Sequence, residues 1–201
     1  MSESAVPTFP SPTVSAASRA EVHLRYLDYF RAVLVAKLKG LPDDELRSSR
    51  LPSGWTPLEL LKHVTHVEAR WLEWGFEGRY VGDPWGARRG GRWHVAAEET
   101  LAHLIGELEN QADRSRVVVE AHALDEVGQP GERWDGASPA TLERVLLHFA
   151  AGVRASRRSP RRRPRTHRRQ SRGGVGGPEG SPDTLPESAI GWHQYAGDAR
   201  V

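Results

Sequence analysis

Histidines are the side chains of this sequence best suited to chemistry. His63 and His66 lie three residues apart in one apolar-periodic segment, and His148 lies in another near the end of the clear pattern. A neutral imidazole nitrogen is a good ligand for zinc, nickel or iron. His63 and His148 are therefore the candidate metal ligands, with packing in the core as the alternative for each and as the favoured reading for His148. We expect His66 to be solvated.

Other residue types narrow the chemistry. The sequence has no cysteine, which excludes disulfides, thiolate ligands and a cysteine nucleophile. Its seven tryptophans are expected to be core residues and loop anchors, and no phosphate-binding loop or catalytic triad pattern is present. Glu68 either orients a metal ligand or pairs with Lys62 or Arg70 on the surface, and we favour the surface pair. Catalytic residues stay unknown.

The charges divide the chain into two unlike parts. Residues 1–148 hold 17 basic and 22 acidic residues, whereas residues 149–201 hold 11 basic and 4 acidic ones. The basic character thus belongs to the end of the chain and says nothing about partners of the first part. No apolar run approaches the roughly 20 residues that cross a bilayer, so we expect no membrane partner and a cytoplasmic protein.

Helical periodicity predicts an all-α fold. Apolar residues recur at spacings of three and four over 19–39, over 57–74 and over about 95–121, and the pattern begins again at Leu142 after a cap-like Ser138-Pro139. Thr56, Pro57 and Glu59 have the arrangement of a capping box at a helix start. Residues 41–46 are expected to form a short turn of helix, and the Gly- and Pro-rich stretches 78–91 and 124–137 to form loops.

Both ends of the sequence have the composition of disordered chain. We expect a disordered leader over 1–18, a helical domain over 19–150 and a disordered Arg/Pro/Gly-rich tail over 151–201. Ten arginines and no acidic residue lie between Gly152 and Gly177, with almost nothing apolar to bury. Such a segment would bind phosphate backbones without sequence preference, which makes nonspecific nucleic acid one candidate partner.

Four stretches of the sequence together resemble the DinB-like family of metal-dependent bundle proteins, specifically the branch related to thiol-dependent transferases. They are YLDYF (26–30), GLPDDEL (40–46), LPSGWTPLELLKHVTHVEARW (51–71) and LERVLLH (142–148). The resemblance implies an up-down-down-up four-helix bundle with a divalent metal, such as zinc, nickel or iron, between helices. It also implies that His63 is a ligand and that the other ligands are a histidine pair late in helix four.

This sequence departs from the family where that histidine pair is expected. Ser156-Arg157-Arg158-Ser159 stands at the place of the pair, so helix four is expected to be truncated. Reading the codons one base later from Phe149 permits LLQEYARHAGHLD and then VVRELIDG, which is a family-like helix with both histidines. We therefore hypothesise a one-base frameshift near Phe149.

Two functions follow from these observations. The first is a metal-dependent hydrolase or thiol-dependent transferase acting on a small-molecule substrate, in which the ion lowers the pKa of a bound water or thiol, and which is impaired in this chain. The alternative is a helical scaffold with an Arg-rich nucleic-acid-binding tail. A shortened fourth helix would expose apolar faces of the others, which favours pairing of chains as a homodimer.

Overall fold

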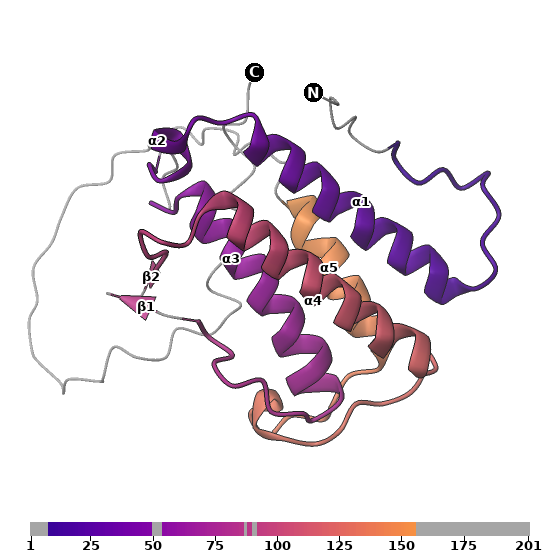
Figure 1. Cartoon of the computed structure of the whole chain (residues 1–201). Helices are drawn as coiled ribbons and strands as arrows, with labels where there is room; N and C mark the ends of the chain where they lie inside the picture. The colour runs from indigo at the N-terminus through magenta and orange to yellow at the C-terminus, as the bar shows by residue number, and fades with distance from the viewer. Residues whose placement is uncertain (1–7, 50–53, 87, 90–91, 156–201) are drawn as a thin grey trace, which may run out of the picture.

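The fold is a helical bundle, as the periodicity predicts. The computed structural model describes residues 8–49, 54–86, 88–89 and 92–155. The long helices run up, down, down and up in chain order (Figure 1). They are α1 (Arg19–Lys39), α3 (Pro57–Glu68) continued by the π-helix η1 (Ala69–Phe76), α4 (Leu101–Ala121) and α5 (Leu142–Ala155). The short elements are α2 (Asp43–Leu46), β1 (Arg88–Arg89), β2 (Arg92–Trp93) and the 3-10 helix η2 (Glu132–Trp134).

Side-chain caps fix where the main helices begin. The Thr56 hydroxyl accepts from the Glu59 backbone N–H at 3.2 Å, and the Glu59 carboxylate accepts from the Thr56 N–H at 2.7 Å. This reciprocal pair confirms the predicted capping box of α3. Ser18 and Thr100 cap α1 and α4 in the simpler way, each accepting one backbone N–H of the first turn.

Three element boundaries differ from the sequence prediction. Helix α4 begins at Leu101 rather than near 95, because Thr100 supplies the cap. The loop predicted over 78–91 contains one arm of a small antiparallel ribbon, in which Arg88 pairs with Trp93. Helix α5 begins at Leu142, where the apolar pattern begins, but Thr141 and not the predicted cap at Ser138-Pro139 precedes it, in an isolated bridge with Val127.

The bundle core consists of two apolar clusters. One contains Leu24, Leu27, Val67, Leu72, Phe76, Val118, Val119, Leu124, Leu142, Val145 and Leu146. The other contains Leu38, Leu46, Leu58, Leu61, Leu104, Ile105 and Leu108. Buried polar residues interrupt the apolar positions of the helices: Arg31 on α1, Glu68 on α3, and Gln111 and Ser115 on α4.

The predicted disordered ends are only partly within the described residues. Residues 8–18 lie beside α1, where the Phe9 ring makes edge contacts with Tyr26 and Tyr29 at centroid distances of 5.4 and 5.1 Å. Helix α5 continues to Ala155, and the rest of the predicted tail lies outside the described residues. Among the described helices, none is long and apolar enough to span a bilayer.

Candidate functional site

His63 lies between two tryptophan rings at the middle of α3. Its ring makes edge contacts with Trp55 at 4.9 Å and with Trp93 at 5.2 Å between centroids. Trp55 directly precedes the cap of α3, and Trp93 lies on β2. Two segments that are far apart in the sequence therefore contact the same histidine. Both tryptophans are buried, with relative exposures of 9% and 2%.

His66 lies one turn further on and is half-buried, not solvated as expected. Its ring lies 5.2 Å from the Trp93 ring, so Trp93 contacts both histidines of α3. Burial lowers the pKa of His66, and the cations Arg70 and Lys62 lower it further, while Asp83 opposes them. His66 is therefore held in the neutral form more firmly than a solvated histidine.

Arg70 fastens the loop that follows η1 to the helix. Its guanidinium lies over the Trp85 ring at 4.5 Å and donates through Nη1 to the Pro84 carbonyl at 3.0 Å. The side chain is buried, and the cation–π contact replaces part of its lost hydration. This contact holds the loop over the side of α3 that carries His66.

Glu68 is buried in an ion pair with Arg31, so the expected surface pair with Lys62 or Arg70 is wrong. The Arg31 guanidinium donates through Nε at 3.0 Å and through Nη2 at 2.6 Å to the two carboxylate oxygens. The Ser115 hydroxyl adds a third bond to the carboxylate at 3.0 Å. Burial lowers the pKa of Arg31, but the Glu68 and Asp28 carboxylates outweigh it and raise the pKa overall.

The Arg31–Glu68 pair belongs to a polar layer that crosses the bundle, which we define as Arg31, Glu68, Glu73, Gln111 and Ser115. Gln111 donates to Glu73 at 2.9 Å and to Ser115 at 3.3 Å, which joins η1 to α4. All five side chains are buried. Lys62, which the sequence made a possible partner of Glu68, instead pairs with Glu99 at 2.6 Å.

His148 lies away from His63. It is an exposed residue of α5, and its ring lies 4.9 Å from the ring of Trp71 in η1. Trp71 follows His63 by eight residues in the sequence. The guanidinium of Arg133 lies 3.7 Å from the same Trp71 ring. The sequence favoured a core position for His148, and this expectation is wrong, because His148 lies on the outward face of α5.

The two candidate ligands therefore do not form a metal site by themselves. Among residues 8–49, 54–86, 88–89 and 92–155, no three histidine, aspartate or glutamate side chains come together in a group that could hold an ion. A usable site needs about three protein ligands and an open position. The positions at which the resemblance places the histidine pair, 156 and 159, lie outside the described residues.

Sequence reasoning missed the residues that connect the helices. Arg31, Gln111 and Ser115 look like ordinary polar interruptions of amphipathic helices. Each falls at a spacing that continues an apolar stripe, for example Gln111 and Ser115 between Leu108 and Val118. A polar residue on an apolar stripe was the available signal for a buried network.

The comparisons with known proteins give one match. A family model described as mycothiol-S-transferase matches residues 23–153, which is more than half of the chain. No curated protein and no solved structure matches. The matched range begins within α1 and ends in the last turn of α5, so it covers the described bundle except for the first turn of α1 and the end of α5.

Proposed function

Because the chain belongs to the mycothiol-S-transferase family, a DinB-like family, we propose that its bundle is the scaffold of a metal-dependent enzyme that transfers a low-molecular-weight thiol to a small electrophile. We further propose that this chain is impaired in that reaction. The observation that carries the second statement is the donor set: His63 lies in the expected helix, but the residues at positions 156 and 159 are serines.

The direction of α5 supports this reading. Helix α5 runs opposite to α3 and η1 (Figure 1), and His148 contacts Trp71. His63 lies eight residues before Trp71, and Ala155 lies seven residues after His148. At about 1.5 Å per residue both displacements are roughly 10 to 12 Å along nearly antiparallel axes. The end of α5 therefore arrives near the level of His63.

One further helical turn beyond Ala155 would carry positions 156 and 159. The alternative reading frame permits histidines at those two positions, three residues apart and so on one face of a helix. Together with His63 they would give the three nitrogen ligands that an open catalytic site needs. We propose that the alternative frame encodes the intact form and that the serines leave His63 without its co-ligands.

The test compares two full-length chains. The first has the sequence described here, and the second carries the alternative-frame segment from position 149 to 169. Both are loaded with zinc, dialysed and analysed for metal per chain, and then assayed for transfer of mycothiol to monochlorobimane. We expect about one zinc per chain and thiol transfer only in the second protein.

A matched variant of the second protein assigns the ligand. Replacing His63 with Gln in the alternative-frame chain keeps the size and polarity of the side chain but removes the imidazole, so zinc binding should fall by at least tenfold. Stoichiometric tight zinc in the chain described here would overturn the impairment. Failure of the alternative-frame chain to bind any divalent ion would overturn the metal site.

A further inference from the structure

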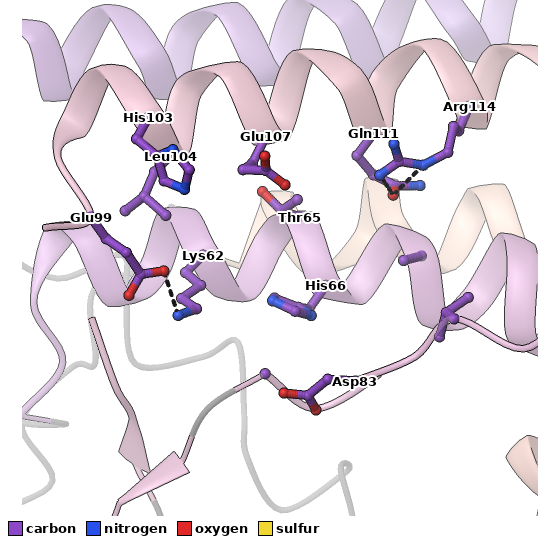
Figure 2. A pocket seen from close by; sticks show the side chains of 13 residues that line it. Lys62, Thr65, His66, Asp83, Glu99, His103, Leu104, Glu107, Gln111 and Arg114 are labelled. Carbon is purple, nitrogen blue, oxygen red and sulfur yellow. Dashed lines mark hydrogen bonds and ion pairs between the residues drawn. The ribbon is translucent and has the colours of Figure 1, made fainter. Parts of the chain in front are cut away.

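A groove between α3 and α4 is a candidate site of its own. It has a volume of about 420 Å³ and is bounded by α3, by α4 and by the loop that carries Asp83 (Figure 2). Cavities that bind small molecules commonly measure about 300 to 1,000 Å³. The groove lies on the outer side of the helix pair and does not include His63 or His148.

Charged side chains are arranged along this groove in a definite order. A cation lies towards each end: Lys62 beside Glu99 at one end and Arg114 beside Gln111 at the other (Figure 2). Carboxylates lie between them, Glu107 on α4 and Asp83 on the loop. The Lys62–Glu99 pair balances the charge at one end, so the groove carries carboxylates in the middle and the cation Arg114 at the other end.

Lys62 and Arg114 differ in how many hydrogen-bond donors remain for a ligand. Lys62 is committed, because its ammonium donates to Glu99 at 2.6 Å and to the His94 carbonyl at 3.0 Å. Arg114 donates through Nε and Nη2 to Gln111, and Nε also lies 3.3 Å from Glu73. A guanidinium has five N–H donors, and among the described residues these bonds involve only Nε and Nη2, so the Nη1 donors are available to a ligand. The side chain is 47% exposed, so a ligand can reach it.

The carboxylate in the middle is likewise available. Glu107 is exposed and forms no ion pair within the part of the chain that the structure describes. The imidazole of His66, which lines the same stretch, does not neutralise it, because burial and the nearby Arg70 and Lys62 lower the pKa of His66. The centre of the groove therefore presents the Glu107 carboxylate to a ligand.

We propose that this groove binds a small zwitterion of the size of a short peptide, with its ammonium at Glu107 and its carboxylate at Arg114. The two residues are seven apart on α4, so they share one face of the helix and their Cα atoms are separated by about 10 Å along it. An extended tripeptide has a comparable distance between its charged ends. Gln111 lies on the same face between them, but its amide is buried and already bonded to Glu73, Ser115 and Arg114, so it holds Arg114 in place instead of contacting the ligand.

This site is independent of the proposed transferase function, because it uses neither His63 nor a metal ion. The two regions are neighbours, since the Trp93 ring contacts both His63 and His66. The chain described here is therefore the right protein for the test, whatever its metal content.

The experiment measures binding of triglycine and two matched probes to the full chain by isothermal titration calorimetry at pH 7 and low salt. N-acetyl-triglycine lacks the ammonium, and triglycinamide lacks the carboxylate. Each charge-assisted hydrogen bond is worth about tenfold in affinity or more. We expect triglycine to bind at least tenfold more tightly than either probe. Equal affinity of triglycine and one of its probes, or no binding of triglycine, would overturn the proposal.

Paired variants place the binding in the groove. Glu107→Gln should weaken triglycine binding about tenfold, by removal of one charge-assisted bond, and should leave triglycinamide no tighter than N-acetyl-triglycine. Glu109→Gln changes the same type of residue on the same helix, but Glu109 is exposed and outside the groove, so it should bind triglycine as the parent does. Equal affinities of the two variants would show that the peptide binds elsewhere.

Discussion

The polar layer and the two apolar clusters occupy the same bundle core but are held together differently. In the clusters, residues such as Leu61 and Leu146 are fully buried and contribute through area removed from water. In the layer, Arg31, Glu68 and Gln111 are equally buried, yet each depends on named partners at hydrogen-bond distance. Loss of an apolar side chain leaves a cavity, whereas loss of a layer residue leaves an uncompensated polar group.

The largest effect should come from breaking the layer. Glu68→Ala removes the bidentate partner of Arg31 and leaves the buried guanidinium with only the half-exposed Asp28 carboxylate, so the free energy of unfolding should fall by about 3 kcal/mol or more. Urea denaturation followed by circular dichroism measures the loss. Glu109→Ala, an exposed residue of α4, is the control and should change stability by less than about 0.5 kcal/mol.

A double variant sharpens this comparison. Arg31→Met combined with Glu68→Leu removes both charges and fills most of the space, so it should be more stable than Glu68→Ala alone. Equal losses in the single and double variants would mean that the layer stabilises through volume, as the clusters do.

Next in size are the apolar substitutions. Leu61→Ala in one cluster and Leu146→Ala in the other should each lower the free energy of unfolding by about 3 kcal/mol, because both side chains are 0 to 1% exposed and leave similar cavities. Equilibrium denaturation of the two variants measures this. A much smaller loss for Leu146 would indicate that the cluster near α5 repacks more easily than the cluster near α2.

The cap of α3 should contribute less, because it stabilises one helix end and not the core. Thr56→Ala removes the acceptor for the Glu59 N–H and should cost about 1 kcal/mol, measured by thermal unfolding. Thr56→Ser keeps the hydroxyl and is the control. A loss as large as that of Leu61→Ala would be the contrary outcome.

The smallest effect concerns pH and the half-buried His66. Its pKa is lower in the folded state than in the unfolded chain, so unfolding takes up a proton as pH falls below the ordinary histidine range. The stability that His66 contributes in its neutral form is present above the unfolded pKa of about 6.5 and is lost as pH falls through the folded pKa. Melting temperatures between pH 8 and 5 should therefore decline less steeply for His66→Gln than for the parent, and parallel curves would contradict this.

Local sequence rules were sufficient to predict the long helices and the starts of α1 and α3. The capping box at Thr56 and the bounds of α1 depend on residues within a few positions of one another, so they could be read from the sequence. The start of α4 at Leu101 and of α5 at Leu142 were less accurately predicted, because Thr100 and Thr141 compete with other plausible caps nearby. The π-helix η1 was not foreseen, because its apolar spacing resembles that of an α-helix continuing from α3.

For the candidate site, too, the sequence predicted some features and only the tertiary structure determined the others. The sequence by itself determined an all-α bundle, the family resemblance and the position of His63, because amphipathic period and motif spacing are properties of neighbouring residues. Only the tertiary structure decided that Glu68 pairs with Arg31, that Trp93 contacts both His63 and His66, and that Glu107 and Arg114 line one groove. These contacts join residues from different helices and loops, and their register is set by how the helices pack, which no local spacing specifies.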